Sequence, residues 1–86
     1  MTAMDEQPAD EILYDSAVDA RGLNCPLPIL KTKKALSELS SGQVLRVVAT
    51  DPGSTREFQA FARQTGHELL EQTTAGEDYV HLLRRR

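Results

Sequence analysis

Alternation of more and less apolar side chains is the first pattern along the chain. It runs over Ile12–Val18 and predicts a strand with one face turned towards a core. Arg21 and Gly22 then predict a turn. After Cys25 the period lengthens to that of an amphipathic helix, whose inner face is formed by Ile29, Thr32, Leu36 and Leu39. Gly42 is expected to end this helix.

The second half of the chain repeats this order. Residues Val44–Thr50 are apolar or β-branched at nearly every position, which predicts a central strand, and Asp51-Pro52-Gly53 breaks it. Ser54 and Glu57 have the spacing of a capping box, in which each side chain bonds a backbone N–H at a helix start. The helix expected here presents Phe58, Phe61, Ala62 and Thr65 on one face. Gly66 is expected to end it.

The last part of the chain has the pattern of a β-hairpin. Residues Leu69–Thr74 and Tyr79–Leu83 flank the turn sequence Ala75-Gly76-Glu77-Asp78. The element order is therefore βαβαββ, with the first two strands parallel through a right-handed crossover. We expect an α/β two-layer sandwich of the α+β type, with a four-stranded mixed sheet and two helices on one face. The other face of the sheet is expected to be exposed to solvent.

Length and composition limit the possible functions. Residues 1–10 are acidic and polar and are expected to form a disordered tail, which leaves one domain over residues 11–86. A domain of this size has little room for a deep substrate cavity, so catalysis on a small molecule is less favoured. The formal net charge of −3 argues against direct binding of nucleic acid, which needs a basic face. No segment is long and apolar enough for a signal peptide or a membrane span, so we expect a cytoplasmic protein. We also expect it to be a monomer.

The single cysteine, Cys25, is the main candidate for chemistry. It cannot form an intramolecular disulfide, and it directly precedes the first expected helix. A helix N-terminus favours a thiolate, and Pro26 and Pro28 suit the first helical turn. The two prolines also remove two of the N–H donors that would otherwise face the sulfur and leave those of Leu27 and Ile29. We therefore expect a rigidly presented and moderately activated sulfur. The alternative is a cysteine buried as a small apolar side chain.

Charged residues near this position leave two interpretations open. The carboxyl ends of the first two strands lie at one edge, so Cys25 and the turn over residues 51–56 should be neighbours. Arg56 would then stabilise a sulfur anion, with Asp51 holding the turn, or it is simply an exposed arginine. Lys31 and Lys34 would contact an acidic partner, or they belong to an ordinary solvated helix face.

The two histidines do not indicate a metal site. His67, His81 and Cys25 lack the close spacing of metal ligands, so we expect no metal and no cofactor. His81 is expected to be a hydrogen-bonded or surface residue of the last strand. His67 follows Gly66 and is expected to lie at the end of the second helix.

The sequence from Asp19 to Pro28 resembles the N-terminal signature of the TusA (SirA-like) sulfur carrier family, whose hallmark is Cys-Pro-x-Pro at a helix start. The segments 51–57 and 67–84 are similar to the corresponding parts of the family. The resemblance implies a two-layer sandwich with a mixed sheet. It also implies that Cys25 accepts sulfur as a persulfide from a cysteine desulfurase or a rhodanese-like donor and passes it to an acceptor protein.

Family members serve tRNA thiolation, molybdenum cofactor synthesis or oxidative sulfur metabolism, and the sequence does not choose between them. Such a carrier is a transferase only in the sense that its own cysteine is a transient covalent intermediate. Two alternatives stay open. One is a regulatory or interaction module that does not use the thiol, and the other is a thiol redox sensor, which would need an intermolecular resolving cysteine.

Overall fold

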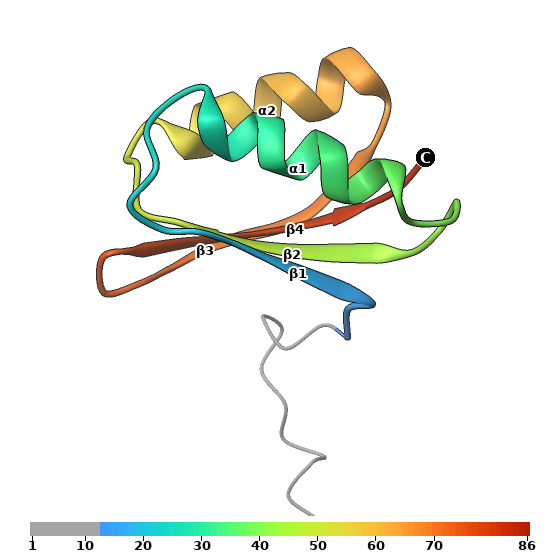
Figure 1. Ribbon diagram of the computed structural model, residues 1–86, viewed down its shortest axis with the longest axis horizontal. Helices are drawn as coiled ribbons and strands as arrows, with labels where there is room; N and C mark the ends of the chain where they lie inside the picture. Colours follow the sequence, from blue (N-terminus) through green and yellow to red (C-terminus); the bar gives the residue numbers. More distant parts are fainter. Residues whose placement is uncertain (1–12) are drawn as a thin grey trace, which may run out of the picture.

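A computed structural model describes residues 13–86. It contains the predicted order of elements (Figure 1), namely β1 (Ser16–Ala20), α1 (Leu27–Ser37), β2 (Val44–Ala49), α2 (Ser54–Thr65), β3 (Glu68–Ala75) and β4 (Asp78–Arg84). The tail predicted at residues 1–10 and the first residue of the predicted strand, Ile12, lie outside the described residues.

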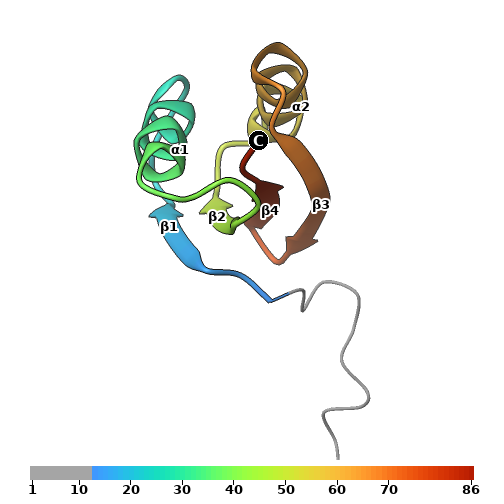
Figure 2. The ribbon, with the colours of Figure 1, turned by 90° about the vertical axis from the view of Figure 1, so that its right-hand side faces the viewer.

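The four strands form one sheet in the order β1-β2-β4-β3. β1 and β2 are parallel, and β4 is antiparallel to both of its neighbours, β2 and β3. Figure 2 shows α1 and α2 side by side on the same face of this sheet. The predicted α+β two-layer sandwich with a four-stranded mixed sheet is confirmed.

The core lies between the two helices and the sheet. Its inner sheet face comes from alternate positions on β2, as the period of a strand requires. Each helix contributes residues from its one apolar face: α1 contributes one residue of this cluster, and α2 contributes two that are three positions apart. The buried cluster consists of Ala20, Leu36, Leu45, Val47, Ala49, Phe58, Phe61 and Leu83.

Two boundaries differ from the sequence-based expectations by several residues. The first strand begins at Ser16 and not at Ile12. Ser16 pairs with Leu45, and β2 begins only one residue earlier, at Val44, so residues before Ser16 have almost no strand to pair with. The first helix ends at Ser37, well before Gly42. The Ser37 hydroxyl donates to the Lys34 carbonyl at 2.6 Å, a local bond typical of a helix end. Gly66 ends α2 as predicted, with a φ of 85°.

The expectation that the outer sheet face is exposed to solvent is wrong for its centre. Val80 and Leu82 on β4 are 8% and 1% exposed. Leu82 lies on an inner strand, directly between its paired residues Arg46 on β2 and Glu71 on β3. Long charged side chains cover apolar neighbours with their methylene groups while their charged ends stay in water. This face therefore combines a buried centre with a polar surface.

Candidate functional site

Cys25 lies in the loop between β1 and α1, and its side chain is exposed. α1 begins at Leu27, Pro26 is its N-cap residue, and the Cys25–Pro26 peptide bond is cis. The interpretation of Cys25 as a buried apolar residue is therefore wrong. The thiol stands in solvent at the start of the first helix, as the sequence predicts.

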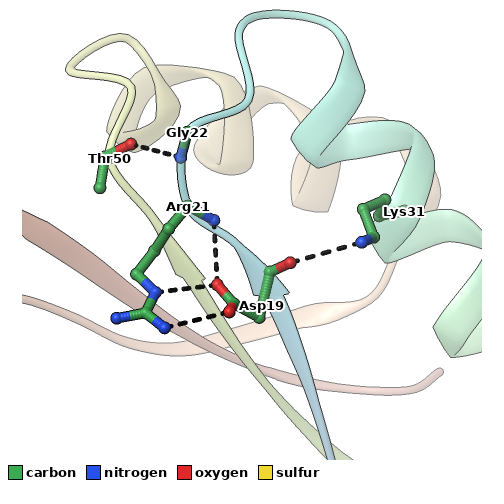
Figure 3. A network of polar contacts seen from close by, with 5 residues as sticks. All are labelled: Asp19, Arg21, Gly22, Lys31 and Thr50. Atoms are coloured by element: carbon green, nitrogen blue, oxygen red, sulfur yellow. Dashed lines mark hydrogen bonds and ion pairs between the residues drawn. The ribbon is translucent and has the colours of Figure 1, made fainter.

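A network of polar contacts fixes the beginning of this loop (Figure 3). The Arg21 guanidinium binds the Asp19 carboxylate through Nε at 2.9 Å and Nη2 at 3.1 Å. These bonds lower the pKa of Asp19 to about 2. The Gly22 N–H donates to Thr50 Oγ1 at 2.8 Å, and Lys31 Nζ donates to the Asp19 carbonyl at 3.4 Å. The loop is thus joined to the end of β2 and to α1.

Asp51 joins the cysteine itself to the second loop. The Cys25 N–H donates to Asp51 Oδ2 at 3.1 Å, and the Gly53 N–H donates to Asp51 Oδ1 at 3.1 Å. The Asp51 carbonyl accepts the Ser54 N–H at 2.9 Å, at the first residue of α2. Cys25 and the turn that begins at Asp51 are therefore neighbours, as the topology predicts.

The predicted capping box at the start of α2 does not form. The N-cap residue is Gly53, and no side chain caps the helix. The buried Ser54 hydroxyl lies 3.0 Å from His81 Nε2, so it faces the sheet. The Glu57 side chain lines a groove together with Cys25, and its Oε1 is buried without a hydrogen-bond partner among the described residues. The positions of both side chains are set by tertiary contacts, which cannot be predicted from the local spacing of Ser54 and Glu57.

An open groove of about 240 Å³ lies beside the sulfur, between the two helices. Cys25 and Glu57 line it together with Pro26 and Ile29 at the α1 side and Ala60, Phe61 and Gln64 of α2. Most of the surface around the thiol is therefore apolar, with one carboxylate. Such a groove accepts the side chains of a protein surface but does not enclose a small molecule.

The charges around the thiol favour its protonated form. The pKa of Cys25 is raised, first by the Glu57 carboxylate, an acceptor that favours the protonated thiol, then by burial and by the charges of Glu57 and Asp51. The expected activation by the helix N-terminus is wrong for the isolated chain. One donor that was expected to face the sulfur, the Leu27 N–H, donates instead to the Asn24 carbonyl at 2.8 Å.

The two prolines of the motif occupy different environments. Pro26 is exposed and lines the groove. Pro28 is fully buried, and its carbonyl accepts a bond of 2.8 Å from the buried Thr32 hydroxyl. Pro26 is thus a surface residue at the sulfur, whereas Pro28 is also part of the core.

The structure does not bring the candidate cations to the sulfur. Arg56 is exposed and does not line the groove, and its side chain makes no hydrogen bond or ion pair within residues 13–86. Lys34 forms an exposed ion pair with Glu38 at 3.6 Å. Lys31 contacts the Asp19 carbonyl. Glu57, which the sequence analysis assigned to a helix cap, is the charged residue that lines the groove with Cys25.

His81 is buried inside the α2–sheet interface. Its ring stacks on Phe58 at a centroid distance of 4.2 Å, and Gln72 Nε2 lies 3.0 Å from its Nδ1. The same Gln72 amide nitrogen donates to the Thr55 carbonyl at 3.0 Å, which fixes it as a donor. His81 Nδ1 therefore accepts, and burial lowers the pKa of His81 to about 4. The alternation Tyr79, His81, Leu83 was the sequence signal for this inward position.

His67 lies between α2 and β3, as expected, and its Nδ1 accepts the Arg86 N–H at 3.0 Å. Over residues 13–86, no group of three or more His, Cys, Asp or Glu side chains is arranged to hold a metal ion. In the same part of the chain, no helix has the length and apolar character needed to cross a membrane.

Comparison with known families shows to which family this chain belongs. The model of the family described as Sulfurtransferase TusA matches residues 16–85, which include all six helices and strands. The chain belongs to the TusA family. The sulfur carrier protein TusA of Allochromatium vinosum is 56% identical over 72 residues, which cover 84% of this chain and 95% of that protein. The sulfur carrier protein TusA of Pseudomonas entomophila is 40% identical over 76 residues, covering 88% and 95%.

A solved structure supports the same assignment. The crystal structure of a SirA-like protein from Desulfitobacterium hafniense superposes with a TM-score of 0.73 at 28% identity, covering 81% of this chain and 96% of that one. Membership of the family and the names of these relatives support a role as a sulfur carrier, which implies interaction with sulfur donor and acceptor proteins.

Proposed function

We propose that the chain is a sulfur carrier that accepts a sulfane sulfur on Cys25 as a persulfide and hands it to an acceptor protein. The observation that carries the proposal is the exposed thiol of Cys25, the only cysteine of the chain, beside an open groove. The names of the relatives support the same role. The proposed donor is a cysteine desulfurase or a rhodanese-like protein. The sulfur would serve tRNA thiolation, molybdenum cofactor synthesis or oxidative sulfur metabolism.

The proposed transfer is a thiol exchange that needs no external oxidant or reductant. Cys25 Sγ attacks the terminal sulfur of the donor persulfide, a new S–S bond forms, and the donor's S–S bond breaks. The electron pair of the broken bond leaves on the donor cysteine, and the proton of the Cys25 thiol is released. Discharge repeats the reaction, with an acceptor thiolate attacking the outer sulfur of the Cys25 persulfide.

Loading with a donor protein tests this function. Incubated with a cysteine desulfurase and free cysteine, the wild-type chain should gain the mass of one sulfur atom, and a thiol reductant should remove it. Cys25→Ser should gain nothing. Because the Cys25 side chain is exposed, the free energy of unfolding of this variant should lie within about 0.5 kcal/mol of the wild-type value. The variant is therefore a folded control.

Two results would overturn the proposal. If desulfurase and rhodanese-like donors leave the wild type unmodified while Cys25→Ser still performs the cellular role, the chain is an interaction module. If persulfide donors fail but dilute peroxide converts Cys25 to a sulfenic acid and then to an intermolecular disulfide, the chain is a redox sensor.

A further inference from the structure

Two carboxylates lie at Cys25, and only one of them is saturated. Asp51 accepts the backbone N–H groups of Cys25 and Gly53, one on each oxygen. Glu57 lines the groove with Cys25, and its Oε1 is buried with no hydrogen-bond partner among residues 13–86. Asp51 therefore has a structural role in the loops, whereas Glu57 keeps an oxygen that can take a proton.

The Cys25 thiol is the proton source beside that carboxylate. A buried carboxylate oxygen without a donor is unfavourable, and the Cys25 thiol, which lines the same groove, is the neighbouring group that has a proton to offer. The Glu57 carboxylate, as an acceptor that favours the protonated thiol, is the largest cause of the raised pKa of Cys25. The other charge that acts on the thiol, Asp51, has the same sign and the same effect. The resting pair is therefore a neutral thiol beside a carboxylate.

We propose that Glu57 carries the proton of Cys25 during sulfur transfer. Glu57 takes the thiol proton while Cys25 Sγ attacks the terminal sulfur of the donor persulfide. The donor's S–S bond breaks, its cysteine leaves as a thiolate, and protonated Glu57 gives the proton to that thiolate. Hydrogen and charge balance, because one thiol proton moves from Cys25 to the donor cysteine and Glu57 returns to its starting state.

Discharge uses the same group in reverse. When an acceptor thiol attacks the outer sulfur, Glu57 takes the proton of that thiol, and the S–S bond of the Cys25 persulfide breaks. Cys25 leaves as a thiolate, and protonated Glu57 gives it the proton, which restores the neutral thiol and the Glu57 carboxylate. The arrangement also explains why a raised thiol pKa is compatible with transfer chemistry. The thiol stays protonated in the isolated chain and becomes nucleophilic only as its proton moves to Glu57. This inference rests on the proposed sulfur-carrier function.

The variant Glu57→Gln separates this role from two others, in which Glu57 only supports the fold or only lowers the reactivity of the thiol. Gln keeps the shape but removes the negative charge and the proton acceptor. Iodoacetamide should then alkylate Cys25 faster at neutral pH, because the thiol pKa falls. Acceptance of sulfur from a desulfurase persulfide should instead slow by about tenfold or more, since general acid–base catalysis contributes at least this much. The two rates are therefore expected to change in opposite directions.

Glu77→Gln, at the exposed β3–β4 turn, is the matched control and should change neither rate. Glu57→Asp, which keeps a carboxylate at a longer distance, should retain more transfer than Glu57→Gln. Transfer by Glu57→Gln at or above the wild-type rate would overturn the proposal, as would a parallel loss of alkylation and transfer. Failure of the wild type to load at all would instead refute the proposed function.

Discussion

The backbone N–H of Cys25 donates to Asp51 Oδ2 across a separation of 26 residues, at 3.1 Å. This bond links the loop after β1 to the loop after β2. Both strands are parallel and paired up to Ala20 and Ala49, so their carboxyl ends deliver the two loops to the same edge of the sheet. The position of the sulfur is thus a direct consequence of the βαβ topology, and Asp51 fixes the last step.

Asp51→Ala should loosen the loop that carries the sulfur. The variant loses acceptors for two backbone N–H groups, Cys25 and Gly53. We expect the free energy of unfolding to fall by about 1–2 kcal/mol, measured by urea denaturation, and single-turnover sulfur acceptance to slow. Asp51→Asn keeps one acceptor oxygen, so its stability and its rate of sulfur acceptance should lie between those of the wild type and Asp51→Ala. Wild-type behaviour of both variants would refute the assignment of Asp51 as the residue that positions Cys25.

Pro26 and Pro28 should have separable effects. Pro28→Ala removes buried volume and should lower the free energy of unfolding by about 1–2 kcal/mol. Pro26→Ala changes an exposed groove residue beside the thiol and should slow sulfur acceptance with little loss of stability. Thermal denaturation and persulfide transfer kinetics measure the two effects. Equal stability losses in both variants, with unchanged transfer, would mean that the motif serves packing alone.

The sequence predicted the parts of this site that depend on topology. The exposed position of Cys25 and its proximity to Asp51 follow from a strand–helix–strand unit with short connections. The role of Glu57 could not be predicted, because its spacing from Ser54 also fits a helix cap. Ser54 instead faces His81 on the last strand, and Glu57 faces the β1–α1 loop. Local patterns do not show which of two available partners a polar side chain takes.

The same limit applies to the expected activation of the thiol. The sequence places Cys25 next to a helix N-terminus, and that part is confirmed. It does not show that the Leu27 N–H donates to the Asn24 carbonyl, or that the charges of two carboxylates act on the thiol. These features depend on the path of the loop and on the side-chain directions of a second helix. The sign of the pKa shift therefore required the tertiary structure.

Lys31 and Lys34 remain candidates for docking an acidic partner surface. Lys34 carries only a weak exposed ion pair with Glu38, so its charge is available to a partner. Lys31→Glu and Lys34→Glu should each slow association with the sulfur donor several-fold, by about 3- to 10-fold at low salt. The wild-type rate should fall as ionic strength rises. Arg56→Glu is predicted to act in the same direction.

Arg63→Glu is the matched control for these charge reversals, because Arg63 is exposed in the last turn of α2 and the change in net charge is identical. Stopped-flow mixing with the donor at several salt concentrations measures the association rate. If Arg63→Glu slows association as much as Lys31→Glu and Lys34→Glu, the effect comes from net charge. If the wild-type rate is insensitive to salt, the lysines belong to an ordinary solvated surface.

His81 should make the protein less stable in mild acid. Burial lowers its pKa from 6.5 to about 4 in the folded chain, so between these values the unfolded chain binds the proton more tightly. The free energy of unfolding should therefore be fully retained above pH 6.5 and fall as the pH drops towards 4. This contribution levels off below pH 4, after a loss on the order of 2–3 kcal/mol.

Urea denaturation at several pH values measures this dependence. His81→Gln lacks the titrating ring, so it should be less stable at pH 7 but should lose less stability between pH 6.5 and 4 than the wild type. His67→Gln is the comparison, because His67 lies outside the Ser54–Gln72 network and should leave most of the slope in place. If the free energy of unfolding of His81→Gln depends on pH as steeply as that of the wild type, carboxylates, and not this buried imidazole, account for the acid sensitivity.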